Sequence, residues 1–408
     1  MADKPRALIV ATMDTKGREA RFLADCLITE GIAVLILDAG IKGQCLGEVD
    51  VTREEVARAG GKSLQDVQNI GHEGKALEVM TNGAIKCARE LHRQGRVQGV
   101  IGLGGSMGTT LGSGVMRSFA VGLPKVMIST MASRDTRAFV GTKDILMLHS
   151  VTDLVGLNRI TRKILRNGAL ALAGMLRSAL PDDPAEKKPL VFVSTLGTTE
   201  ACAQQIRKTL EEKNNEVVIF HTVGSGGKSM EEMIEQEDVS LLVDMSLHEI
   251  ADHLFGGDYD AGPTRGTMAL DREITTILVP GNIDFLVTGP LKNAQKQFPN
   301  RPFHVHNAAI TVVRTRQEEI KIMARTIAGL CNTAKGPVKI LVPMNGFSAF
   351  DHKEGPLRDP EAPEIFAKTL EKNLDDKSHL HVLPYYINDS EFAQAIIDMV
   401  YRISPDVS

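Results

Sequence analysis

The sequence predicts an α/β protein made of two Rossmann-like domains, each built on a doubly wound parallel sheet. Apolar runs rich in valine, isoleucine and leucine alternate with helical patterns along the whole chain, which is the pattern of repeated βαβ units. Glycine or small polar residues bound each run, as they do for buried parallel strands. The two halves of the chain also resemble each other, so we interpret the protein as an apparent duplication.

The first half contains four strand-like runs, in the order ALIVAT, AVLILDAG, GVIGLGG and KVMIST. An excursion rich in charge and glycine follows the second run, over residues 44–74. Within it, Thr52 and Glu55 have the spacing of a capping box, which predicts a helix start. This excursion either covers a site or is a surface insertion. Leucine and isoleucine recur at three- and four-residue steps over residues 153–180, which predicts a long helix at the end of this half.

The second half contains five further runs, in the order LVFVST, VVIFHT, SLLVDMS, TILVPG and KILVPM. A polar loop, a helix, a last strand at HLHVLPYY and a helix capped by Asp389 or Ser390 complete the chain. Thr12 and Thr195 are as far apart in the sequence as Asp38 and His221. A duplication explains this match, although any two βαβ units share some likeness.

Proline and charge dominate residues 178–189 between the halves, as they do in linkers. We therefore predict a first domain over residues 1–180 that ends in the long helix, and a linker over residues 181–189. The second domain, over residues 190–408, carries the extra strand–loop–helix segment. The chain's 408 residues agree with two or three domains.

The composition of the chain argues against several classes of protein. The formal net charge is −4 and the chain contains no tryptophan, so neither a basic patch nor a base-stacking surface favours nucleic acid as a partner. The five cysteines are odd in number and form no CxxC pair, which is typical of reduced thiols. The longest apolar run is too short for a membrane span and no signal peptide is evident. We therefore expect a cytoplasmic protein with no membrane partner.

The glycine-rich stretch GLGGSMGTTLGSG, over Gly102–Gly114, follows the third strand of the first half. Ligands of doubly wound sheets bind beyond the carboxyl ends of the strands, and free amides at a helix start favour phosphate. The stretch matches neither the Walker pattern nor a GxGxxG that opens the first βα unit, so a tight turn without a ligand remains an alternative. The expected nucleotide-binding residues at the strand ends are Thr12, Asp14, Thr15, Lys16, Asp38, Gly104, Gly105, Ser106, Gly108, Thr109, Thr110, Ser129, Thr130 and Arg134.

Histidines follow several strands of the second half, which suggests acid–base chemistry or a metal. The spacing of His248 and His253 is five residues, so HEIADH is not the HExxH zinc helix. His304 and His306 share one side of a strand and are either the start of a metal site or a buried pair. Ser348 lacks the G-x-S-x-G context of a nucleophile. The candidate catalytic residues are His221, His248, Glu249, His304 and Asp351.

Several motifs in order resemble the Tm-one-like ATP-binding proteins, a bacterial and plant family named after a tomato tobamovirus-resistance protein. They are IVATMDTKGRE, VLILDAG, GLGGSMGTTL, ISTMASRDT, VTDLVGLNRITRKIL and PMNGFSAFDHKEGPLRDPEA. The resemblance covers nearly the whole chain and implies two α/β subdomains, ATP binding and a homodimer, with no settled reaction. Family members tend to have an aromatic residue where this chain has Leu357, which puts a stacking role there in doubt.

Three functions follow as hypotheses. The first is a nucleotide-binding protein with ATP phosphates on the Gly102–Gly114 loop and Mg²⁺ on Asp14, because phosphate sites bring this ion through one or two carboxylates. The second is a hydrolase or lyase in which the loop holds a small anionic substrate and the histidine, glutamate and aspartate side chains of the second half react. The third is a regulatory protein that senses a nucleotide without chemistry.

Overall fold

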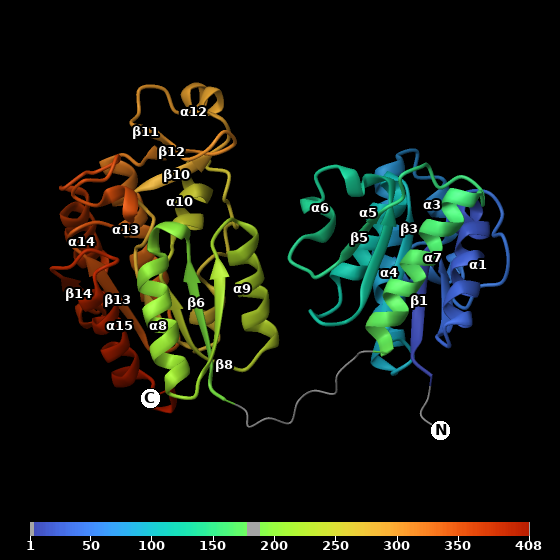
Figure 1. The fold of residues 1–408 in the computed structure, drawn as a ribbon, viewed down its shortest axis with the longest axis horizontal. Helices are drawn as coiled ribbons and strands as arrows, with labels where there is room; N and C mark the ends of the chain where they lie inside the picture. The colour runs from blue at the N-terminus through green and yellow to red at the C-terminus, as the bar shows by residue number, and fades with distance from the viewer. Residues whose placement is uncertain (1–3, 178–187, 408) are drawn as a thin grey trace. The chain divides into compact units, whose positions relative to one another are not determined.

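The computed structural model describes residues 4–177 and 188–407. It divides the chain into two compact units, Met1–Asp183 and Pro184–Ser408 (Figure 1). Each unit contains a parallel sheet flanked by helices, which confirms the predicted fold class. Most of the expected linker, residues 181–187, lies outside the described residues.

The N-terminal unit has a five-stranded parallel sheet in the order β2-β1-β3-β4-β5. Its strands are β1 (Arg6–Ala11), β2 (Ala33–Asp38), β3 (Gly99–Gly104), β4 (Lys125–Ser129) and β5 (Leu146–His149). Its helices are α1 (Met13–Thr29), α2 (Arg53–Ala59), α3 (Leu64–Gln68), α4 (Glu73–Arg93), α5 (Ser106–Arg117), α6 (Arg137–Val140) and α7 (Arg159–Arg177), with the 3-10 turn η1 (Thr130–Ser133). The edge strand β5 was not predicted, because its four residues are half exposed and form no continuous buried run.

Helices cover both faces of this sheet (Figure 1). Side chains of α1 and α7 pack on one face with Ile9, Ile101 and Ile128. Side chains of α2, α4 and α5 pack on the other face, with Leu8 and Val100. The capping box at Thr52 and Glu55 is present at the start of α2 and confirms that prediction.

The long helix starts later than predicted, at Arg159 and not at Asp153. Gly156, inside the predicted range, has a positive φ angle of 74°, which an α-helix cannot contain. The side chain of Asn158 accepts hydrogen bonds from the amides of Ile160 and Thr161 and starts the helix there. Residues 150–158 therefore form a connection that leaves the sheet edge before α7 begins.

The C-terminal unit has a six-stranded parallel sheet in the order β14-β13-β9-β8-β6-β7. Its strands are β6 (Leu190–Thr195), β7 (Glu216–His221), β8 (Val239–Asp244), β9 (Thr275–Leu278), β13 (Val338–Pro343) and β14 (Leu380–Leu383). Its helices are α8 (Glu200–Glu212), α9 (Ser225–Gln236), α10 (His248–Phe255), α11 (Met268–Asp271), α12 (Leu291–Gln297), α13 (Gln317–Asn332), α14 (Ala362–Asn373) and α15 (Ser390–Ile403). In chain order, its first five strands repeat the arrangement of the N-terminal sheet, as a duplicated unit would.

The register supports the same relation. Ala11 pairs with Asp38 at the ends of β1 and β2, and Thr195 pairs with His221 at the ends of β6 and β7. The predicted alignment of the halves is thus reproduced to within one residue.

An antiparallel sheet of three strands is inserted between β9 and β13, in the order β10-β12-β11. Its strands are β10 (Phe285–Thr288), β11 (Phe303–Val305) and β12 (Thr311–Arg314). Figure 1 shows it beyond the carboxyl ends of β6 and β8. The FHV run is therefore an edge strand of a small antiparallel sheet, so His304 does not follow a strand of the main sheet. Among the described helices, none is long and apolar enough to cross a membrane.

Candidate functional site

A cavity of about 730 Å³ lies in the N-terminal unit between the carboxyl ends of β1 and β3. The strand order reverses direction at this point, and doubly wound sheets bind ligands at such a switch point. The volume is in the range of small-molecule sites. The lining residues are Thr12, Asp14, Thr15, Lys16, Ala39, Ile41, Lys42, Val67, Gln68, Ile70, Gly71, His72, Glu73, Ala76, Leu77, Gly104, Gly105, Ser106, Met107, Gly108 and Asp153.

The start of α5 gives this cavity a set of free backbone donors. Gly105 is the N-cap and supplies no side-chain cap. The first backbone bond joins the amide of Thr109 to the carbonyl of Gly105 at 2.8 Å. Among the described residues, the amides of Ser106, Met107 and Gly108 have no hydrogen-bond acceptor. Three free amides at the positive end of a helix dipole form a site for an anion.

The glycines of the loop have two different roles. A Cβ on Gly104 would lie 2.8 Å from the Cα of Gly108, so these two residues allow α5 to pack against the end of β3. A Cβ on Gly102 would lie 2.9 Å from the sulfur of Met127. A Cβ on Gly105 would meet nothing closer than the Thr130 hydroxyl at 3.9 Å. Gly105 alone among these three faces open space at the cavity.

Asp14 provides an unsatisfied acceptor in the wall. Its Oδ2 accepts from the amide of Lys42 at 3.0 Å. Its Oδ1 is buried and has no hydrogen-bond partner among the described residues. An orphaned carboxylate oxygen fits a ligand hydroxyl or a cation bound with a phosphate. The described residues contain no group of three or more histidine, cysteine, aspartate or glutamate side chains suited to a metal ion, so such a cation would need ligand oxygens.

Lys16 is held at the cavity by the connection over residues 150–158. Its ammonium donates to the carbonyl of Leu154 at 2.6 Å, and the neighbouring Asp153 lines the cavity. The excursion and α4 also line the cavity, with the apolar side chains of Val67, Ile70 and Leu77 and the polar side chains of Gln68, His72 and Glu73. The cavity thus combines cationic and amide donors with apolar surface. Sequence patterns did not single out Ile41, Lys42, His72 or Asp153, because only the fold brings these segments to the switch point.

Asp38 lies at the expected ribose position but is fully engaged by the protein. It is 1% exposed. Its Oδ1 accepts from the amides of Met13 at 2.9 Å and Gly40 at 2.8 Å. Its Oδ2 accepts from Nε of Arg53 at 2.8 Å. Asp38 therefore anchors the start of α1 and the excursion next to the cavity.

The other predicted nucleotide-binding residues surround the loop without lining the cavity. The Thr109 hydroxyl is buried and contacts the Ser129 hydroxyl at 2.6 Å. Thr110 donates its hydroxyl to the carbonyl of Ser106 at 2.9 Å. Thr130 is half-buried in η1 and Arg134 is exposed. Thr109 and Ser129 join the end of β4 to the start of α5, which is a supporting arrangement.

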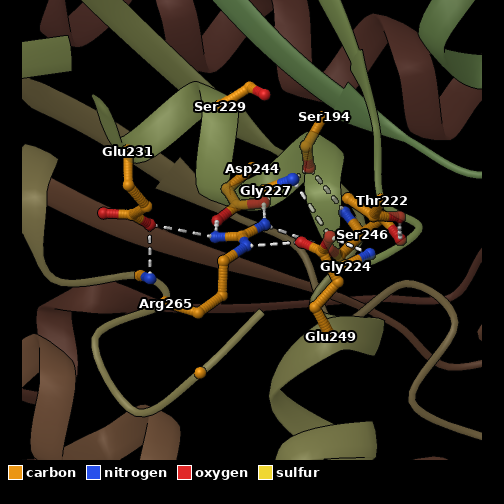
Figure 2. Close-up of polar contacts among 12 residues, drawn as sticks. Ser194, Thr222, Gly224, Gly227, Ser229, Glu231, Asp244, Ser246, Glu249 and Arg265 are labelled. Carbon is orange, nitrogen blue, oxygen red and sulfur yellow. Dashed lines mark hydrogen bonds and ion pairs between the residues drawn. The ribbon is translucent and has the colours of Figure 1, made fainter. Parts of the chain in front are cut away.

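In the C-terminal unit, the predicted Glu249 belongs to a buried network around Arg265 (Figure 2). Nε of Arg265 lies 2.8 Å from Oε2 of Glu249, and its two terminal nitrogens bind both oxygens of Asp244 at 2.6 and 2.8 Å. Oε1 of Glu249 accepts from the amides of Gly224 and Gly227. Glu231 joins from α9, 3.4 Å from Nη1 of Arg265. The oxygens of Glu249 are thus occupied by the protein.

The predicted histidines have three different environments. His248 is fully buried, with Nδ1 2.9 Å from the carbonyl of Asn282 and Nε2 3.3 Å from Asp252. Burial lowers the pKa of His248, but the nearby Asp252 carboxylate and the hydrogen bond to the carbonyl of Asn282 more than offset this, so the pKa is raised. His221 is exposed at the end of β7. The ring of His304 packs against Phe350 with centroids 5.1 Å apart.

The predicted Asp351 is buried beside a second carboxylate, Asp284. Burial and then the Asp284 charge raise the pKa of Asp351 to about 7. Leu357 lies nearby in an apolar cluster with Phe285, Val287 and Val312, so this position has a packing role here.

Comparison with known proteins identifies relatives over nearly the whole chain. Residues 5–181 and 188–404 match the N- and C-terminal domains of the uncharacterised protein family UPF0261. A UPF0261 protein of Clostridium tetani is 36% identical over 96% of this chain and 97% of its own length. The ToMV resistance protein Tm-1 of Solanum lycopersicum is 30% identical over 99% of this chain and 56% of its own length.

Among solved structures, a UDP-N-acetylglucosamine 2-epimerase covers 68% of this chain and 79% of its own, at 12% identity and a TM-score of 0.23. That score is too low to support a structural or functional argument. The family matches extend through both units and include the segments that form the cavity. The chain therefore belongs to the UPF0261 family, and its relatives include the tomato Tm-1 protein.

Proposed function

We propose that the N-terminal unit binds a nucleoside triphosphate, ATP, in the switch-point cavity. The observation that carries the proposal is the uncapped start of α5 at the wall of a cavity of about 730 Å³. The free amides of Ser106, Met107 and Gly108 would bind phosphate oxygens, and the ammonium of Lys16 would lie near them. The apolar surface at Val67, Ile70 and Leu77 suits a base.

Mg²⁺ would accompany the phosphates through Asp14. The orphaned Oδ1 of Asp14 supports this role, and Asp153 is a second carboxylate of the cavity. Mg²⁺ in phosphate sites is held by one or two carboxylates together with substrate oxygens. Such shared coordination agrees with the cavity, where the described protein side chains alone do not form a complete metal site.

The first prediction concerns Gly105. Gly105→Val would place a side chain in the cavity without a backbone clash, because its Cβ has open space. We expect ATP affinity measured by calorimetry to fall by at least about tenfold, which is about 1.4 kcal/mol. The matched control is Gly174→Val, since Gly174 is exposed on α7 and its Cβ would meet nothing within 4 Å. Equal ATP affinity in both variants would contradict the proposal.

The second prediction concerns Asp14. Asp14→Asn keeps the size of the side chain and an acceptor for Lys42 but removes the charge. We expect Mg²⁺ to strengthen ATP binding in the wild type and to have little effect in the variant. Calorimetric titrations with ATP, with and without MgCl₂, measure the difference. An unchanged effect of Mg²⁺ in the variant would assign the ion to other groups.

A thermal-shift panel separates this function from the alternatives, because a ligand of the native state raises the melting temperature by mass action. We expect stabilisation by ATP and not by NAD or simple sugar acids. Stabilisation by an organic acid alone would favour a metabolic enzyme whose glycine loop holds a carboxylate. ATP binding without phosphate release would favour a nucleotide sensor over a nucleotide-consuming enzyme.

A further inference from the structure

The C-terminal unit contains a buried cluster of charged residues that the nucleotide site does not use. Asp284 precedes β10, Arg314 ends β12, and Ser348 and Asp351 belong to the loop after β13. The two aspartates and Ser348 are fully buried, and Arg314 is 6% exposed. Three segments that are distant in the sequence thus meet beyond the carboxyl end of the sheet, where doubly wound folds bind ligands.

The protein holds the two carboxylates firmly. The Ser348 hydroxyl donates to Oδ2 of Asp284 at 2.7 Å. Asp351 accepts from the amides of Asp359 at 3.0 Å and Phe347 at 3.2 Å. One nitrogen of Arg314, Nη1, lies 3.5 Å from Asp284 and 3.7 Å from Asp351. The contacts of Nη1 therefore hold the guanidinium between the carboxylates of Asp284 and Asp351.

The other edge of the guanidinium makes no hydrogen bond to the described residues, although the Asp359 carboxylate lies 3.9 Å from Nη2. Nη1 of Arg314 also donates to the carbonyl of Asp284 at 2.9 Å. Nε and Nη2 are buried and have no hydrogen-bond partner among the described residues, and the same holds for Oδ1 of Asp284. Leaving such groups unpaired costs stability. The Nε–Nη2 edge is one that binds a carboxylate or phosphate through two parallel hydrogen bonds.

Two partly exposed side chains contact the cluster. Asp359 lies 3.9 Å from Nη2 of Arg314 and is 23% exposed, and Arg358 lies 3.7 Å from Asp351 and is 24% exposed. Burial and the Asp284 charge raise the pKa of Asp351 to about 7, and burial also raises the pKa of Asp284. Near neutral pH Asp351 is therefore partly protonated, which reduces the repulsion of an anion, and its protonated form provides an O–H donor.

We propose that this cluster is a second small-molecule site, in which the Nε–Nη2 edge of Arg314 binds the carboxylate or phosphate group of a ligand beside the acid pair of Asp284 and Asp351. The ligand class is a small organic acid or a phosphate ester. The site shares no residue with the nucleotide cavity of the N-terminal unit.

The test is calorimetric titration of the full chain with malonate and with inorganic phosphate, at constant ionic strength. We expect one of these probes to bind, and Arg314→Lys to weaken it by at least about tenfold, because lysine keeps the charge but lacks the two-pronged edge. Arg207→Lys is the control, since Arg207 pairs with Glu211 on α8 and contacts no residue of the cluster. We expect it to leave binding unchanged.

Phosphate could also enter the nucleotide cavity, so the titrations are repeated with Gly105→Val. Binding that persists in Gly105→Val and is lost in Arg314→Lys belongs to the cluster. Binding with the opposite dependence, or no binding of either probe, would overturn the proposal. If Arg314→Lys fails to fold, wild-type crystals soaked in each probe give the answer, because the proposal requires density against Nε and Nη2 of Arg314.

Discussion

Arg265 connects three acidic side chains in the buried interior of the C-terminal unit. It contacts the carboxylates of Asp244, Glu249 and Glu231, and its side chain is 1% exposed. Burial raises the pKa of Glu231 although Arg265 opposes this shift. Removal of one partner from a buried ionic network is costly, because it leaves the other charges uncompensated. The candidate catalytic Glu249 is thus also a structural residue, and any variant of it will report on both roles.

We therefore expect Arg265→Met to lower the free energy of unfolding by about 3–5 kcal/mol. Urea denaturation followed by circular dichroism measures this loss. Arg207→Met is the control, because Arg207 is 42% exposed in its pair with Glu211, and a surface pair contributes about 1 kcal/mol or less. Similar losses in the two variants would show that the network around Arg265 does not stabilise the fold.

The raised pKa of Asp351 predicts that the stability of the fold depends on pH. Its pKa is about 7 in the fold, above the ordinary 3.8, so folding favours the protonated carboxyl. This contribution to stability is complete below about pH 4 and is lost as the pH rises through 7. Because His248 and Glu231 also have raised pKa values, the comparison needs a variant that removes one group only.

Asp351→Asn keeps a neutral side chain at every pH. We expect its stability relative to the wild type to increase between pH 5 and pH 8, in urea titrations at both values. A difference between variant and wild type that stays constant with pH would mean that Asp351 is ionised throughout, and that the acid pair holds no proton at neutrality.

At the scale of elements, the joint between β3 and α5 creates the cavity wall. Gly104 and Gly108 let the helix start close to the strand end, and Gly105 then turns its open side to the cavity. The connection over residues 150–158 supplies the Leu154 carbonyl that holds Lys16. In this connection Val151 has a φ of 60°, an unfavourable conformation for a β-branched residue. Strained backbone of this kind is frequent next to functional sites.

Gly104 and Gly105, at the junction between β3 and α5, are predicted to respond differently to substitution by alanine. Gly104→Ala would place a Cβ 2.8 Å from the backbone of Gly108, so we expect a loss of about 1–3 kcal/mol from overpacking. Gly105→Ala has open space and should change stability by no more than about 0.5 kcal/mol. Thermal and urea unfolding of the two variants measure these changes. A tolerant Gly104→Ala would show that α5 can move away from β3 at little cost.

At the scale of the whole molecule, the two sheets share a strand order but differ at their switch points. In the N-terminal unit the gap between β1 and β3 is an open cavity. In the C-terminal unit the corresponding strands are β6 and β8, and buried side chains fill that place. Asn282, with a φ of 62°, donates to the hydroxyls of Thr199 and Ser246 there. The same architecture thus leaves an open cavity in one unit and contains an internal hydrogen-bond network in the other.

Hydrogen exchange of the full chain tests this difference. With saturating ATP and Mg²⁺, we expect slower amide exchange at the starts of α1 and α5 and in the excursion around Val67. The amides around Asn282 should not change, since their network is already complete. Protection confined to the C-terminal unit would show that the nucleotide binds there and not in the N-terminal cavity.

The sequence by itself determined the α/β class, the strands of the two parallel sheets except β5, and the residues at their ends. This was possible because buried parallel strands produce continuous apolar runs and because strand ends carry the loops. Eight of the predicted residues line the cavity, namely Thr12, Asp14, Thr15, Lys16, Gly104, Gly105, Ser106 and Gly108. These residues follow β1 and β3, which are neighbours in the sheet.

Only the tertiary structure decided which strand-end residues face a ligand and which face the protein. Asp38, Glu249 and His248 are of residue types that often react or bind ligands. In the fold, however, they contact Arg53, Arg265 and the carbonyl of Asn282, which lie 15 or more positions away in the sequence. Arg314 had no sequence signal, because its acid partners come from two other loops. Residue type and spacing fix local structure, whereas burial and hydrogen-bond partners depend on contacts between distant segments.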